Sequence, residues 1–280
     1  QGHIPGSAGI LLESEGKKLF YTGDTNANET RLLTPAEYPD EADILVMEST
    51  YGNRIHPDRS KVEKDFLEEV SATVERGGHV LVPAFAIGRA QEMLLILKDL
   101  GYQVYLDGMA KKASQMMLRH PEFLKDADNL LEAVNDAIFV EGRRHRREIL
   151  KQEPAVIVTT AGMLAGGPVL DYLGRLHKDA NSSILLTGYQ VDDTNGRLLI
   201  DGGYVIDEET NARFDVLMET RQYDFSAHSD QHDLIELAKK LNPEHVVLVH
   251  GDEASADALA GKLSGFKVHV PSVGEKISFD

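Results

Sequence analysis

Short apolar runs alternate with segments of helical periodicity between residues 79 and 187, and this alternation constrains the fold most. Runs rich in Val, Ile and Leu occupy 79–83 (HVLVP), 103–106 (QVYL), 154–160 (PAVIVTT) and 183–187 (SILLT). Strands that are apolar throughout are typical of parallel sheets covered by helices on both faces. Helical spacing of apolar residues predicts helices over 59–76, 89–100, 110–118 and 169–177. The middle of the chain therefore predicts a doubly wound parallel α/β unit.

The two ends of the chain predict a second, separate α/β layer. Residues 9–22 favour two strands joined by a tight turn, and 42–47 (ADILVM) favours a buried strand. This layer also includes predicted helices at 231–241 and 254–263 and strands at 246–249 and 268–270, whereas a predicted hairpin at 202–216 falls within the middle unit. We therefore expect an insertion, in which 52–222 interrupts a domain built from 1–51 and 223–280.

Charge and cysteine content narrow the range of functions. The 280 residues include 46 acidic and 29 basic side chains, for a net charge of −17, which disfavours a broad electrostatic grip on nucleic acid or membranes. The absence of cysteine excludes disulfides and thiolate metal sites, so a metal would need His, Asp or Glu. It also fits a reducing compartment, and we expect a cytoplasmic protein. No apolar stretch approaches the roughly 18 residues of a membrane span.

Three polar residues beside glycines are candidates for metal ligands. His3 lies in GHIPGS, Asp24 in TGDT and His250 in VLVHGD, each near a predicted strand end. Imidazole and carboxylate groups suit zinc or manganese, and neighbouring glycines allow a ligand to approach the backbone. Each motif alone favours ordinary turn chemistry, and the flanking glycines reduce that preference without removing it, so both interpretations stay open.

A second candidate pair comprises His228 in FSAHSD and Glu48 in MESTYG. A carboxylate beside a histidine suits general acid–base chemistry because it sets the tautomer and raises the basicity of the imidazole. Alternatively, Ser229 or Asp230 is simply the N-cap of the helix that follows, and His228 is incidental. Sequence spacing does not show whether Glu48 and His228 meet.

The middle unit also carries glycine-rich and basic features suited to phosphate binding. The loop 161–167 (AGMLAGG) and the turn before Arg89 each follow a strand and precede a helix, where backbone N–H groups can hold a phosphate. Tyr189 offers a stacking surface, and 143–147 (RRHRR) is the densest basic patch. Ordinary βα turns and a solvated helix face are the alternatives. The candidate phosphate contacts are Arg89, Gly162, Gly166, Gly167 and Tyr189.

Together these motifs resemble the β-CASP branch of the metallo-β-lactamase superfamily, which includes RNase J, the polyadenylation endonuclease and archaeal relatives. The matching motifs, in the family's order, are GHIPGSAG with His3, YTGDT with Asp24, MESTYGNR with Glu48, PAFAIGRAQE at 83–92, AGMLAGG at 161–167, FSAHSD with His228 and VLVHGD with His250. The resemblance implies part of an αββα metallo-β-lactamase sandwich with an inserted parallel α/β β-CASP domain.

The resemblance implies zinc-dependent hydrolysis of RNA phosphodiester bonds, in RNA processing or decay. It assigns His3 and His250 as ligands of two zinc ions, and Asp24 as the carboxylate that bridges them and takes part in catalysis. His228, steered by Glu48 and standing apart from the ligands, would stabilise or protonate the leaving oxygen. Endonuclease and 5′-exonuclease modes both remain open. A non-catalytic RNA-binding scaffold is the alternative. A DNA-directed member of the family is disfavoured because such members usually carry an apolar residue at the position of His250.

One family motif, His-x-His-x-Asp-His, is absent from these 280 residues. In relatives it precedes the position of His3, so we expect a longer polypeptide to carry it. The chain by itself is then expected to be inactive on RNA, to hold less than one tightly bound zinc, and to expose an apolar sheet edge. RNA is the expected partner, no membrane is expected, and homodimerisation stays open.

Overall fold

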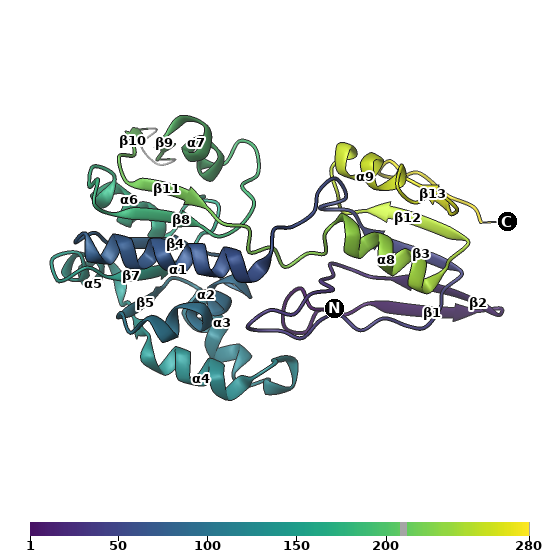
Figure 1. The fold of residues 1–280 in the computed structure, drawn as a ribbon, viewed down its shortest axis with the longest axis horizontal. Helices are drawn as coiled ribbons and strands as arrows, with labels where there is room; N and C mark the ends of the chain where they lie inside the picture. Colours follow the sequence, from purple (N-terminus) through teal and green to yellow (C-terminus); the bar gives the residue numbers. More distant parts are fainter. Residues whose placement is uncertain (208–211, 280) are drawn as a thin grey trace. The chain divides into compact units, whose positions relative to one another are not determined.

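The structure is a computed structural model that describes residues 1–207 and 212–279. It divides into two compact units: Gln1–His56 together with Ser226–Asp280 form the first, and Pro57–Phe225 form the second. The purple start and the yellow-green end of the chain share one sheet, and the second unit interrupts them in sequence (Figure 1). The boundaries between the units lie at 56/57 and 225/226, compared with 51/52 and 222/223 expected from the sequence.

The first unit is built on a five-stranded sheet with the order β1-β2-β3-β12-β13. β1 and β2 form an antiparallel hairpin, whereas β2, β3, β12 and β13 run parallel. Its elements are β1 (Ile10–Ser14), β2 (Lys17–Tyr21), β3 (Ile44–Glu48), α8 (Gln231–Leu241), β12 (His245–Val249), α9 (Glu253–Ala260) and β13 (Lys267–His269). The apolar core joins β3 and β12 to both helices through Leu45, Leu234, Leu248 and Leu259, all 2% exposed or less.

The hairpin forms the open edge of this sheet. Glu15 and Gly16 both have positive φ, as a two-residue turn that matches the strand twist requires. Every residue of β1 is exposed, including Ile10 at 52%, Leu11 at 41% and Leu12 at 57%. The expected exposed apolar edge is therefore present, and such edges favour association with another chain.

The second unit contains a six-stranded sheet with the order β11-β8-β4-β7-β5-β6. All neighbouring strands are parallel, as the alternating pattern predicts. Its strands and flanking hairpin are β4 (Val80–Pro83), β5 (Val104–Asp107), β6 (Ile138–Phe139), β7 (Val156–Thr159), β8 (Ser183–Leu186), β9 (Tyr204–Ile206), β10 (Arg213–Asp215) and β11 (Glu219–Gln222). Strands β4, β5, β7 and β8 are buried along their whole length.

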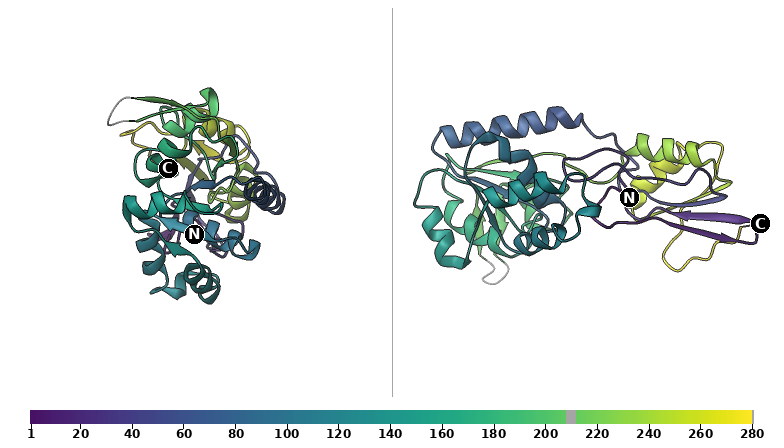
Figure 2. Two further views of the ribbon diagram at one scale, coloured as in Figure 1. Left: turned by 90° about the vertical axis from the view of Figure 1, so that its left-hand side faces the viewer. Right: turned by 90° about the horizontal axis from the view of Figure 1, so that it is seen from below.

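Helices cover both faces of this sheet. They are α1 (Arg59–Glu75), α2 (Arg89–Leu97), α3 (Ala110–Met117), α4 (Ala127–Asp136), α5 (Gly142–Ile149), α6 (Pro168–Leu176) and α7 (Asn195–Gly202), with short 3-10 turns at Lys98–Leu100 and Pro121–Phe123. Residues from α5, α6 and α7 share one core around Tyr172, while α2 contacts α3 and α4. The right-hand view of Figure 2 shows α1 as the long blue helix along one side of this unit.

Most predicted elements are present within one or two residues of their expected ends. The predicted helix 254–263 ends early, at Ala260, and the hairpin predicted within 202–216 comprises β9 and β10. Sequence patterns missed α4, α7, β6 and β11, the last because its residues, ETRQ, lie at the sheet edge without an apolar pattern. No helix among the described residues combines the length and the apolar character needed to cross a membrane.

Gly78, between α1 and β4, is packed so closely that a side chain there should destabilise the second unit. A β-carbon would lie 1.8 Å from the carbonyl oxygen of Asn181. We expect Gly78→Ala to lower the free energy of unfolding by about 1–3 kcal/mol, measured by urea denaturation. Gly174→Ala, at an exposed position of α6, is the matched control: an added β-carbon there meets no described atom within 4 Å. This substitution should raise stability by about 0.5–1 kcal/mol. Equal effects of the two substitutions would contradict the packing argument.

Candidate active site

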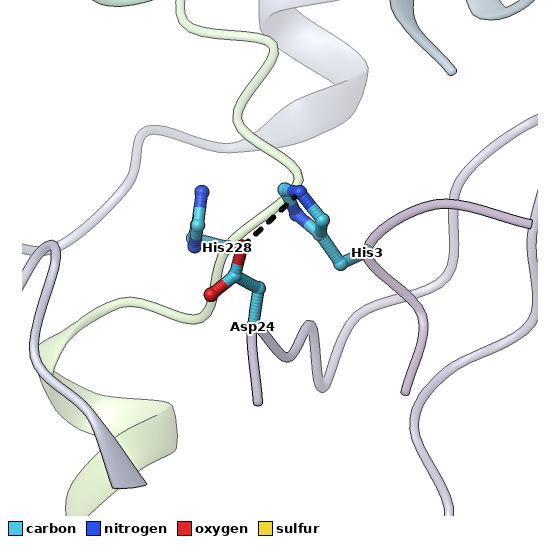
Figure 3. Close-up of side chains that lie close together, drawn as sticks. All are labelled: His3, Asp24 and His228. Carbon is cyan, nitrogen blue, oxygen red and sulfur yellow. Dashed lines mark ion pairs between the residues drawn. The ribbon is translucent and has the colours of Figure 1, made fainter. Parts of the chain in front are cut away.

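Five ionisable side chains of the first unit gather at the carboxyl edge of its parallel strands. Asp24 follows β2, Glu48 ends β3 and His250 follows β12. Because these three strands run parallel and adjacent, their carboxyl ends meet at one edge. His3 and His228 reach the same place from the loops before β1 and α8, and Figure 3 shows His3, Asp24 and His228 converging.

Asp24 lies between two histidines. Its Oδ2 is 3.7 Å from Nε2 of His3, and its Oδ1 is 3.4 Å from Nδ1 of His250. Nδ1 of His3 donates a hydrogen bond of 2.9 Å to the carbonyl of Ala227, which leaves the lone pair of Nε2 directed toward Asp24. Burial, and then the neighbouring His228, hold the pKa of His3 below its usual value. His3 is therefore neutral near pH 7, the form that can bind a metal.

The backbone at His250 is held in an uncommon conformation. His250 has a φ of +55°, and a β-carbon on Gly251 would lie 2.4 Å from Oγ of Ser49. The hydroxyl of Thr50 donates to the carbonyl of His250 at 3.0 Å, and its oxygen lies 3.2 Å from Nδ1 of the same residue. Left-handed conformations of non-glycine residues cost energy and concentrate at functional sites. Here the surrounding contacts orient the imidazole.

His228 and Glu48 form a direct pair. Nδ1 of His228 lies 2.7 Å from Oε2 of Glu48, although 180 residues separate them in the chain. Glu48 is 1% exposed, and its Oε1 accepts a 2.6 Å hydrogen bond from the backbone N–H of Thr25. Both carboxylate oxygens are therefore engaged. This arrangement fixes the proton of His228 on Nδ1 and leaves Nε2 as the nitrogen that can act on a substrate.

His228 does not stand apart from the candidate ligands, and that expectation is wrong. Its ring centroid is 4.4 Å from that of His3 and 5.9 Å from that of His250. The cause is the short loop before α8, whose Ala227 carbonyl binds His3 and so brings His228 alongside. Any role of His228 must therefore be separated experimentally from metal binding.

The loop 51–56 supports this site, and motif reasoning missed it. Nε2 of His56 donates to the carbonyl of His228 at 3.2 Å, and the ring of Tyr51 packs edge-on against both histidines. The guanidinium of Arg54 lies 4.2 Å from the centre of the Tyr51 ring. The only signal in the sequence is that these residues directly follow the Glu48 motif.

The donor set fits a divalent metal such as zinc. Two groups of side chains place their ligand atoms within 4.8 Å of one another: His3, Asp24 and His228 form one, and Glu48, His228 and His250 form the other. Zinc prefers imidazole nitrogen and carboxylate oxygen, and its catalytic sites use three protein ligands. Glu48 already binds Thr25 and His228, whereas His228 belongs to both groups, so the geometry leaves His228 as well as His3, Asp24 and His250 able to reach a metal.

The other candidate residues belong to the second unit, at the carboxyl ends of its strands. Arg89 begins α2 after β4, Gly162, Gly166 and Gly167 lie between β7 and α6, and Tyr189 follows β8 and is 44% exposed. Gly166 and Gly167 have positive φ. A β-carbon on Gly162 would lie 3.1 Å from the backbone nitrogen of Phe85, so the loops after β4 and β7 are in contact.

The basic residues of the run 143–147 make different kinds of contact. Arg146 binds the buried carboxylate of Asp107 at 2.6 Å, and Arg144 pairs with Glu148 at 2.8 Å on the helix surface. Arg143 and Arg146 both line a groove of about 700 Å³, together with Arg175 and the 166–167 glycines. Arg143, Arg144 and Arg147 are exposed, as a solvated helix face predicts, whereas Arg146 binds a buried carboxylate.

Two family models match the chain. The Beta-Casp domain matches residues 90–199, and the Zn-dependent metallo-hydrolase RNA specificity domain matches residues 213–271. The first match covers the strands and helices from α2 to α7, and the second covers the segment that contains His228 and His250.

Several archaeal proteins are similar over most of the chain. Probable RNase MJ4 of Methanocaldococcus jannaschii is 42% identical over 99% of this chain and 67% of its own length. RNase aCSPSF2 of Saccharolobus solfataricus is 40% identical over 99% of this chain and 57% of its own length. Transcription termination factor FttA of Methanothermobacter thermautotrophicus is 36% identical over 94% of this chain and 45% of its own length. The chain thus spans about half to two thirds of these relatives.

Proposed function

The chain belongs to the β-CASP branch of the metallo-β-lactamase superfamily, and from this premise we propose that the complete protein hydrolyses phosphodiester bonds of RNA. Its fold is a metallo-β-lactamase layer with an inserted β-CASP domain. The observation that carries the proposal is the Glu48–His228 pair, 2.7 Å apart, beside His3, Asp24 and His250. A scaffold that only binds RNA has no use for a buried proton-transfer pair next to metal-type ligands.

Two zinc ions per complete protein would be held in part by His3, Asp24 and His250. When bound, zinc supplies Lewis-acid stabilisation of phosphate charge and acidifies the attacking water. Asp24 is suited to bridging because its two oxygens face different histidines, His3 and His250. The neutral form of His3 keeps its Nε2 available for this task.

His228 is the proposed proton donor to the leaving oxygen of the cleaved bond. Its Nδ1–H is held by Glu48, so protonation of the ring places the second proton on Nε2. Glu48 lies in direct contact with the ring, and its negative charge stabilises the imidazolium form of a proton donor. Tyr51 and His56 restrict the ring and the backbone of His228, which keeps this nitrogen in one direction.

RNA contacts are proposed for the carboxyl edge of the second unit. Arg89 offers a charge for phosphate, the glycines at 162, 166 and 167 allow close backbone approach, and exposed Tyr189 offers a face for base stacking. Because the net charge is −17, these local contacts must act against overall repulsion of the RNA. Binding should therefore weaken steeply with salt.

We expect Arg89→Ala to weaken RNA binding while leaving the cleavage rate at saturating RNA nearly unchanged. A phosphate contact away from the cut bond contributes to binding in the ground and transition states alike. Its loss should make the negative slope of log K against the logarithm of salt concentration shallower by about 0.7 for single-stranded RNA. Fluorescence anisotropy with labelled RNA across a salt series measures both quantities.

The matched control for this substitution is Arg119→Ala. Arg119 is exposed just after α3 in the same unit, so replacing it removes the same charge at a different position. Equal weakening by both variants would show a general charge effect and would contradict a specific contact at Arg89.

The activity itself is tested with the complete polypeptide and end-labelled single-stranded RNA. Hydrolysis that a chelator abolishes and zinc restores supports the proposal, whereas RNA binding without hydrolysis under any divalent metal supports the scaffold alternative. Internal fragments from a 5′-labelled substrate indicate endonuclease action, and release of the labelled terminal nucleotide alone indicates 5′-exonuclease action.

A further inference from the structure

A second cluster of histidines lies away from the candidate active site. His245 begins β12 and His269 ends β13, whereas His250 follows the carboxyl end of β12. Five residue steps at about 3.3 Å each place His245 and His250 roughly 16 Å apart along the strand. A ligand at His245 would therefore be independent of the His3–Asp24–His250 group.

The strand register brings the two histidines together. His245 pairs with Lys267, and Val247 pairs with His269, in the parallel β12–β13 ladder. Because side chains alternate in direction along a strand, His245 and His269 lie diagonally on one face. Nδ1 of His245 is 3.0 Å from Nε2 of His269, and the rings stack at 27° with centroids 5.3 Å apart.

The other ring nitrogen of His245 faces a carboxylate. His245 is 6% exposed, and its Nε2 has no hydrogen-bond partner among the described residues. Oε1 of Glu244 lies 3.8 Å from this nitrogen, and the same oxygen pairs with Lys267 at 2.8 Å. The negative charge favours a proton on Nε2 and leaves the Nδ1 lone pair directed at His269. Histidines that ligate metals commonly orient their second nitrogen toward a carboxylate in this way.

The distance between the two facing nitrogens matches chelation. Imidazole nitrogens bound to one ion at about 2.0–2.1 Å stand roughly 2.9 Å apart at a right angle and roughly 3.4 Å apart in a tetrahedron. The observed 3.0 Å is near the right-angle value, which is typical of square-planar or octahedral coordination. Copper and nickel prefer such geometries and bind nitrogen sites more tightly than earlier divalent metals.

We propose that His245 and His269 form a second metal site, specific for Cu²⁺ or Ni²⁺, which joins β12 to β13. The ion replaces the single proton shared by the two rings. His269 is half-buried, which leaves one side of the site open for water molecules to complete the coordination. The ring of Phe279 lies edge-on to both imidazoles, with centroids 5.0 Å and 5.7 Å away, and packs against the site.

Nickel titration of the 280-residue chain tests the site. A background variant, His3→Ala with His250→Ala, removes both histidines of the His3–Asp24–His250 group. Calorimetric titration of this variant in imidazole-free buffer should show that one equivalent of Ni²⁺ binds. Adding His269→Ala should weaken that binding at least tenfold, whereas His120→Ala, an exposed histidine of the second unit, should change nothing.

A second measurement locates the ion directly. Paramagnetic Cu²⁺ should broaden the amide NMR signals of Val246 and Val268 in the background variant and spare them after His269→Ala. Because His269 is half-buried and belongs to a short edge strand, its replacement is expected to fold, and circular dichroism checks this. The proposal is overturned if no ion binds below roughly 100 μM, or if binding is equal with and without His269. Either result would identify the pair as hydrogen-bonded only, and neither bears on RNA hydrolysis.

Discussion

Replacing His228 by alanine in the complete polypeptide is expected to lower RNA cleavage about 10²–10⁴-fold, the usual contribution of a general acid or base. The physical reason is the 2.7 Å contact with Glu48, which fixes the Nδ1 proton and directs Nε2 outward. Single-turnover cleavage of labelled RNA measures the effect. Glu48→Gln should cause a smaller loss, because an amide oxygen can still accept from Nδ1 but no longer stabilises the charged ring.

Metal content decides whether His228 is a proton donor or a ligand, since its ring lies 4.4 Å from that of His3. We expect the His228→Ala protein to keep its zinc, measured by elemental analysis after gel filtration. His232→Ala, an exposed histidine on α8, is the matched control and should keep full activity. Loss of zinc in step with activity would assign His228 to the metal and would refute its role as a proton donor.

Replacing Asp24 by asparagine is expected to have the largest effect on metal binding. Asp24 places one oxygen 3.7 Å from Nε2 of His3 and the other 3.4 Å from Nδ1 of His250. Asparagine keeps the shape but offers only one neutral oxygen, so neither a bridging role nor charge neutralisation survives. We expect zinc affinity to fall more than about 100-fold and cleavage to fall to background, since second-sphere changes alone cost 10–100-fold.

Competition with a fluorescent zinc chelator measures this affinity. Asp40→Asn, which removes an exposed carboxylate of the same unit, is the matched control and should bind zinc normally. Urea denaturation of the metal-free proteins should show equal stability for both variants. Zinc affinity close to that of the unsubstituted protein in Asp24→Asn would remove Asp24 from the ligand set.

The predictable part of the fold is the part set by local pattern. Runs such as 80–83 and 156–159 are apolar throughout because both faces of their strands are covered, so composition alone marks them as central strands. The order of the strands in the sheet could not be predicted in this way. β7 lies between β4 and β5 although it follows both in sequence, and β11 pairs with β8 without any apolar signal. Such pairings depend on how helices pack over the sheet, and a single sequence carries no local trace of them.

The sequence by itself determined the chemistry available to this protein: without cysteine, any metal must be held by histidine and carboxylate, and motif order indicated His3, Asp24, Glu48, His228 and His250. Only the tertiary structure decided which of these groups contact one another. Glu48 contacts His228, which lies 180 residues later in the chain, and the loop before α8 that carries His228 also places its ring next to that of His3. The reason is that parallel strands deliver their carboxyl ends to one edge regardless of sequence separation. Which side chains then touch depends on loop lengths and backbone angles that no spacing rule contains.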